Sequence, residues 1–89
     1  MNVREALRKM VGIAVSARKM DEASRNAGYH ENPFWDIYGE AVDAIYILIG
    51  EKTNTIDEAV TYQVINDDSY TNDDRVDLLM EEYERNVSA

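Results

Sequence analysis

The chain contains no cysteine, one proline and one histidine among its 89 residues. Without cysteine it forms neither a disulfide nor a thiolate metal site, which excludes a secreted disulfide-stabilised scaffold. The single histidine, His30, excludes a di-metal carboxylate site of the helical-bundle type, because that site needs two Glu-x-x-His units. No combination of acid, base and nucleophile can be assembled around it. We therefore expect no catalytic residues, no metal ligands, no cofactor and no enzymatic activity.

Glycine-rich loops and long apolar runs are also absent. The four glycines are isolated at positions 12, 28, 39 and 50, so there is no phosphate-binding loop. The longest apolar run, residues 44–49, is far shorter than the ~20 residues that a membrane-spanning helix needs. The first residues alternate charged and apolar side chains, without the apolar core of a signal peptide. These features predict a cytoplasmic protein that does not contact a membrane.

Four segments have the apolar spacing of amphipathic helices. We expect an all-α single domain over residues 1–89, a small bundle of about four helices near 2–26, 33–49, 56–65 and 72–85. Asn32 is a suitable N-cap before Pro33 at the first helical position. Gly28 and Gly50 stand where helices end.

The third of these segments is the least certain element in the sequence. Thr55 and Glu58 have the spacing of a capping box, which favours a helix. The alternative is a strand, because β-branched residues suit extended structure. The segment has four near its middle and end: Val60, Thr61, Val64 and Ile65.

The predicted core draws on all four segments. The second helix is apolar on every side over its last turn and a half, so we expect it to be the central one, with Gly39 permitting a close crossing. The first helix has two adjacent apolar stripes, as a helix between two neighbours requires. We expect ten side chains to be largely buried: Leu7, Met10, Ile37, Tyr38, Ile45, Leu48, Val60, Val64, Leu79 and Met80.

Charge is divided unevenly along the chain. Residues 1–28 carry six basic and three acidic side chains, whereas residues 29–89 carry three basic and fifteen acidic ones. Many of these carboxylates recur at helical spacing. The candidate partner-binding residues are one row in the second helix (Asp36, Glu40, Asp43), one row in the last helix (Asp73, Asp77, Glu81, Glu84) and three neighbours of that row (Asp67, Asp68, Asp74). An ordinary solvated surface is the other interpretation, because acids near a helix start favour the helix dipole and acidic faces favour solubility.

The negative segment repels nucleic acid and attracts basic proteins. Rows of carboxylates on rigid helices take the place of phosphates. We therefore expect a small acidic interaction module or inhibitor, a nucleic-acid mimic that binds a basic, nucleic-acid-binding protein and does not bind nucleic acid directly. In size and charge alone it is analogous to inhibitors from phages and mobile elements and to immunity proteins of nuclease toxins.

The alternative function is a small dimeric helical protein with a structural or regulatory role. It would use the basic first helix, although a net charge of +3 beside −12 makes a poor DNA-binding surface. The small core and the eight aromatic residues also predict a homodimer, because a short chain leaves apolar surface uncovered.

Overall fold

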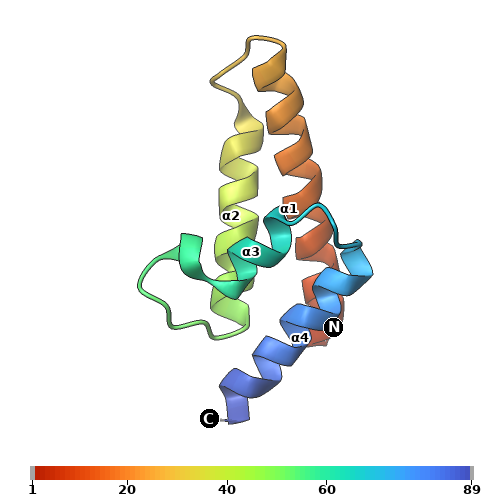
Figure 1. The fold of residues 1–89 in the computed structure, drawn as a ribbon, viewed down its shortest axis with the longest axis vertical. Coiled ribbons are helices and arrows are strands. Elements are labelled where there is room, and N and C mark those ends of the chain that lie inside the picture. The colour runs from red at the N-terminus through yellow and green to blue at the C-terminus, as the bar shows by residue number, and fades with distance from the viewer. Residues whose placement is uncertain (1, 89) are drawn as a thin grey trace.

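The computed structural model describes residues 2–88. These residues form four α-helices and one turn of 3-10 helix, and no strand occurs among them. The elements are α1 (Val3–Asn26), α2 (Pro33–Leu48), η1 (Ile56–Glu58), α3 (Val60–Asn66) and α4 (Asn72–Ser88). The all-α class and the four predicted helices are therefore confirmed (Figure 1).

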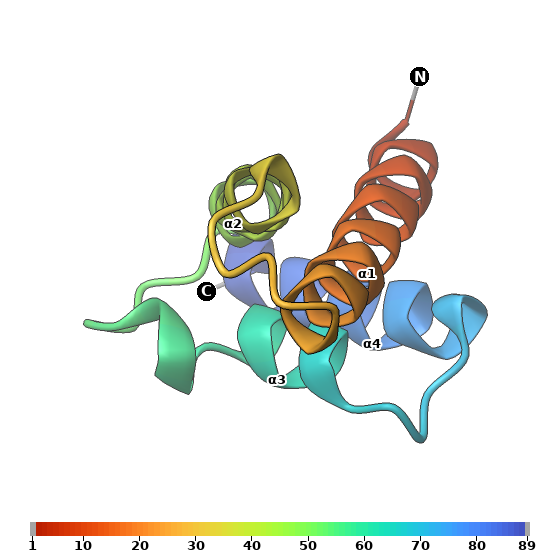
Figure 2. The same ribbon diagram turned by 90° about the horizontal axis from the view of Figure 1, so that it is seen from above.

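The helices are arranged in two layers. α1 and α2 lie side by side and antiparallel as a long hairpin, and α3 and α4 pack across one side of it (Figures 1 and 2). α1 contacts α2, α3 and α4. The expectation that the second helix is central is therefore wrong, and α1 is the central element. The apolar end of α2 is not surrounded, since Ile47 there is 67% exposed.

The core lies between the two layers. Leu7 and Val11 of α1, Ile45 of α2, Ile65 of α3 and Leu79 of α4 are all completely buried. Burying a side chain of this size contributes roughly 1.5–3 kcal/mol. One shared core thus holds all four helices together as a single domain.

Most of the predicted core is confirmed, and two predictions about α2 are wrong. All the side chains expected in the core are buried or half-buried except Ile37, which is 44% exposed. Ile37 lies on the side of the hairpin away from α3 and α4, beside Ile13 of α1. Gly39 makes no close helix crossing, because a Cβ placed there would meet no atom within 4 Å.

The predicted helix ends are confirmed by local hydrogen bonds and backbone angles. The Asn32 side chain accepts a hydrogen bond from the Phe34 N–H at 3.0 Å, and Pro33 occupies the first turn of α2. Gly28 follows α1 with φ 96° and Gly50 follows α2 with φ 73°. Left-handed angles of this kind favour glycine, which explains why the two helices end there.

The third segment is interrupted, and its predicted capping box is absent. η1 ends at Glu58, and Ala59 is extended (φ −71°, ψ 148°) before α3 begins. The Thr55 side chain makes no capping hydrogen bond. The start of α3 is instead capped by Glu51, whose carboxylate accepts hydrogen bonds from the backbone N–H groups of Val60 (3.1 Å) and Thr61 (2.6 Å).

A reciprocal cap of the predicted kind occurs at the start of α4. The Thr71 hydroxyl accepts a hydrogen bond from the Asp74 N–H, and the Asp74 carboxylate accepts one from the Thr71 N–H, both at 3.1 Å. The reciprocal pair satisfies two of the backbone donors that a helix start leaves free.

Candidate acidic interface

The candidate carboxylates are all exposed, but the two rows do not lie together. Asp36 and Glu40 border a hollow on the outer side of the hairpin, between α1 and α2. Asp43 borders a different hollow, between α2 and η1. The row on α4 belongs to the other layer of the molecule (Figure 2). A partner that binds one row along its length therefore does not lie along the other.

The three carboxylates around the turn before α4 have partners within the chain. Asp67 accepts hydrogen bonds from the Ser69 hydroxyl (2.6 Å) and the Ser69 N–H (2.9 Å), and these bonds lower the pKa of Asp67. Asp68 forms an ion pair with the Arg18 guanidinium at 2.9 Å. Asp74 belongs to the reciprocal cap of α4. Each of these side chains helps to order the turn.

The row on α4 comprises Asp73, Asp77, Glu81 and Glu84, and we refer to it as the α4 acidic face. Asp77 forms an ion pair with Arg4 at 2.9 Å, with side chains that are 63% and 45% exposed. An exposed pair of this kind contributes about 0–1 kcal/mol. Among the residues that the structure describes, the other three members of the face form no ion pair. Most of the negative charge of this face is therefore uncompensated.

Arg75 lies on the buried side of α4, and its charge points into the protein. Its side chain is buried, and its guanidinium donates hydrogen bonds to the carbonyl oxygens of Val64 (3.0 Å) and Asp67 (2.8 Å) and to the Asn72 side chain (2.8 Å). A cation near the last carbonyls of α3 also suits the dipole of that helix. Arg75 thus holds α3 against α4.

The two charge-rich parts of the chain also pair with each other. Arg4–Asp77 and Arg18–Asp68 both join the basic first helix to the acidic second layer. These residues are more than 45 positions apart in the sequence. Some of the opposite charges in the two parts of the chain are therefore paired with each other inside the fold. The other charged side chains remain available at the surface.

A polar cluster that the sequence indicates only in part closes the loop end of the hairpin. Asp21 is buried and accepts hydrogen bonds from the Arg25 guanidinium (2.9 and 3.0 Å) and the Asn32 side chain (2.9 Å). Arg25 also lies 5.3 Å from the ring of Trp35, a cation–π contact. The sequence signal was the Asp21–Arg25 spacing of four residues, but the third partner comes from beyond the loop. This cluster positions α2 against α1.

No group of three or more His, Cys, Asp or Glu side chains within residues 2–88 is placed to hold a metal ion. His30 is exposed in the loop between α1 and α2. No described helix has both the length and the apolar character to cross a membrane. Comparison of the chain with protein-family models, curated proteins and solved structures finds no match.

Proposed function

We propose that the protein is an acidic interaction module whose α4 acidic face binds a basic surface of a nucleic-acid-binding protein. The observation that carries this proposal is the unpaired charge of the α4 acidic face. Its four carboxylates are exposed, and within residues 2–88 only Asp77 has an ion-pair partner, Arg4. Arg75 and Arg85, the two cations of α4, are bonded to other groups, namely the carbonyl oxygens of Val64 and Asp67 and the Glu82 carboxylate.

The geometry of the face suits a surface that contacts phosphates in a row. α4 is 17 residues long, and carboxylates four residues apart on a helix are separated by about 6 Å along its axis. The reciprocal cap and the buried Arg75 fix the start of α4, so these charges are held on a rigid element. Rigid positioning reduces the entropy lost on binding.

Such a module acts by binding and without catalysis or a cofactor. By occupying the nucleic-acid site of its partner it would act as an inhibitor, in the manner of the phage, mobile-element and immunity proteins to which it is analogous in size and charge. The alternative, phosphate binding by α1, has weaker support. Three of its basic residues already pair with carboxylates of the chain: Arg4, Arg18 and Arg25.

The test compares two double charge reversals that change the net charge equally. Asp73→Lys with Glu81→Lys alters the α4 acidic face, and Asp43→Lys with Asp57→Lys alters the exposed carboxylates between α2 and η1. The probe is a purified core histone, a basic DNA-binding protein, immobilised for surface plasmon resonance. Binding of the wild type should be fast at low salt, because exposed charges steer association and are screened by salt.

We expect the α4 reversal to abolish histone binding and the α2–η1 reversal to weaken it only slightly. The wild type should also displace duplex DNA from the histone. Equal losses in the two variants would mean that net charge alone governs binding, and a larger loss in the α2–η1 variant would move the site off α4. Either result contradicts the proposal.

A further inference from the structure

Arg4 brings a positive charge to the α4 acidic face from the other end of the chain. Its guanidinium Nη1 donates a hydrogen bond to Oδ1 of Asp77 at 2.9 Å, across 73 positions of the sequence. Arg4 lies in the first turn of α1, where the helix dipole disfavours a cation. The energetics of α1 alone therefore do not favour this arginine, and the contact that compensates is the one with α4.

The guanidinium of Arg4 is bound at the middle of the face. Asp73 precedes Asp77 by four residues and Glu81 follows it by four, so each lies about 6 Å from Asp77 along the helix axis. A positive charge at this position competes for the carboxylates that a basic partner would contact, and it repels the cations of that partner. Salt screens this effect only in part, because the Debye length at physiological ionic strength is about 8 Å.

The contact between the two side chains is one that a partner can replace. A single hydrogen bond joins Arg4 to Asp77, and it is the only one that the Arg4 guanidinium makes within residues 2–88. A guanidinium in bidentate geometry would instead give the carboxylate two parallel hydrogen bonds. The Arg4 and Asp77 side chains are 45% and 63% exposed, so water solvates both charges when the pair opens.

We propose that Arg4 is an intramolecular competitor for the α4 acidic face, an autoinhibitory contact that a basic partner displaces from Asp77. This inference rests on the function proposed for that face and names what limits its affinity. In the free protein Arg4 takes the place of the partner's cation, and in the complex that cation takes the place of Arg4. Removing the Arg4 charge should therefore tighten binding.

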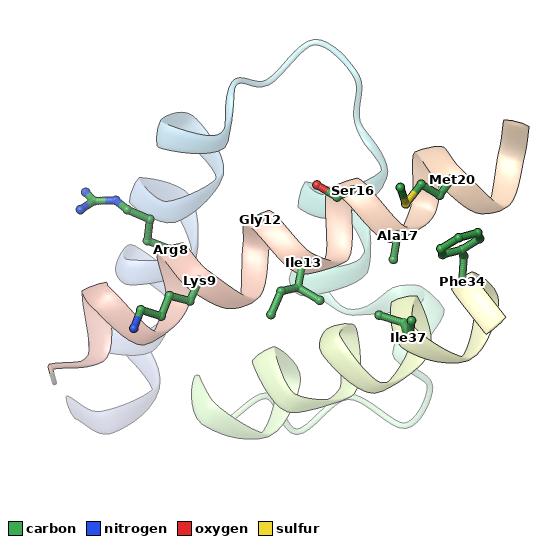
Figure 3. Close-up of a pocket in the computed structure, with 9 residues that line it drawn as sticks. All are labelled: Arg8, Lys9, Gly12, Ile13, Ser16, Ala17, Met20, Phe34 and Ile37. Carbon is green, nitrogen blue, oxygen red and sulfur yellow. The ribbon is translucent and has the colours of Figure 1, made fainter.

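The test measures the dissociation constant for the immobilised core histone by surface plasmon resonance, in Arg4→Gln and in Arg8→Gln, at about 0.15 M salt. Arg8 is the matched control. It follows Arg4 by one helical turn and points away from α2 (Figure 3), it is exposed, and it forms no ion pair within residues 2–88. We expect Arg4→Gln to lower the dissociation constant by about two- to fivefold and Arg8→Gln to change it by less than about 1.5-fold.

A double-mutant cycle separates competition for Asp77 from a general effect of charge. Asp77→Asn removes the carboxylate that Arg4 occupies. In that background, Arg4→Gln should change the dissociation constant by no more than Arg8→Gln does, because there is no longer a contact to displace. Circular dichroism should show unchanged helix content in every variant, since Arg4, Arg8 and Asp77 are exposed.

Three results would overturn the competitor alone, in a wild type that binds the histone through α4. They are equal tightening by Arg4→Gln and Arg8→Gln, tightening by Arg4→Gln that persists in the Asp77→Asn background, and an Arg4→Gln variant that binds no more tightly than the wild type. A wild type that does not bind the histone would overturn the proposed function and the competitor together.

Discussion

Glu51 caps α3 through two hydrogen bonds from Thr61. Its carboxylate oxygen Oε1 accepts them from the backbone N–H and the side-chain hydroxyl of Thr61, both at 2.6 Å. The other oxygen, Oε2, accepts a hydrogen bond from the Val60 N–H at 3.1 Å. α3 is only seven residues long, so it depends on contacts with the rest of the chain more than on its own propensity. Glu51 ties it to the loop that follows α2.

Glu51→Ala should lower the free energy of unfolding by about 1–3 kcal/mol, because it leaves donors at the start of α3 without their charged acceptor. Urea denaturation followed by circular dichroism measures this. Glu58→Ala is the control, since Glu58 has the capping-box position in the sequence but its side chain makes no hydrogen bond to Thr55. Equal losses of unfolding free energy in the two variants would show that Glu51 does not stabilise the protein as the cap of α3.

Arg75→Met should lower the free energy of unfolding by about 3 kcal/mol. Methionine keeps much of the side-chain volume but removes the hydrogen bonds that the buried guanidinium donates to Val64, Asp67 and Asn72. Arg85→Met is the comparison, because Arg85 is 68% exposed and its partner is Glu82 on the same helix. That variant should change the stability by less than about 0.5 kcal/mol. Similar values for the two variants would contradict the role given to Arg75.

Ile45→Ala and Ile47→Ala test which side of α2 is buried against the rest of the protein. Ile45 is completely buried, so its truncation to alanine should lower the free energy of unfolding by about 2–5 kcal/mol. Ile47 is two residues away and 67% exposed, so its truncation should cost under about 1 kcal/mol. The measurement is chemical denaturation of both variants at concentrations where the oligomeric state is constant. A large loss at Ile47 would mean that this side chain is covered in solution.

Tyr38 makes the fold sensitive to alkaline pH. Burial raises the pKa of the Tyr38 hydroxyl, which also accepts a hydrogen bond from Asn66 at 2.7 Å. Because the folded pKa is above the unfolded one, this contribution to stability is complete below about pH 10 and is lost as the pH rises through the folded pKa. Tyr38→Phe should therefore lose less stability than the wild type as the pH is raised from about 9 to above 10.

The comparison for this prediction is Tyr29→Phe, because Tyr29 is 69% exposed. Urea midpoints at the two ends of the alkaline range measure the loss in each protein. Tyr29→Phe should lose as much stability at alkaline pH as the wild type does. If Tyr38→Phe loses the same amount as well, titration of Tyr38 does not contribute to alkaline unfolding.

Helix positions were predictable from the sequence because the signals that fix them are local. Asn32 and Pro33 start α2, and Gly28 and Gly50 end their helices, through contacts within a few residues. Capping spacing alone was not sufficient. Thr55 and Glu58 have the same spacing as Thr71 and Asp74, but only Thr71 and Asp74 form a reciprocal cap. The backbone at Ala59 is extended, so the helix expected after Thr55 is interrupted before α3 begins.

For the candidate interface, the sequence placed the α4 carboxylates on one exposed face but did not show which cations accompany them. Arg4 reaches Asp77 across 73 positions of the chain. Arg75 turns inward to the carbonyls of the segment before it. Neither contact follows from spacing within one helix, because each depends on how two elements pack.

The sequence by itself determined the number and amphipathic character of the α-helices and most of their ends, since a period of 3.6 residues and a cap are properties of a local segment. Only the tertiary structure decided which apolar stripe is covered. Leu7 and Val11 of α1 are completely buried, while Ile13 of the same helix is 51% exposed. The helical period predicts that these residues share a broad apolar surface. Because α3 and α4 both pack on one side of the hairpin (Figure 2), the other side is left to water or to a partner.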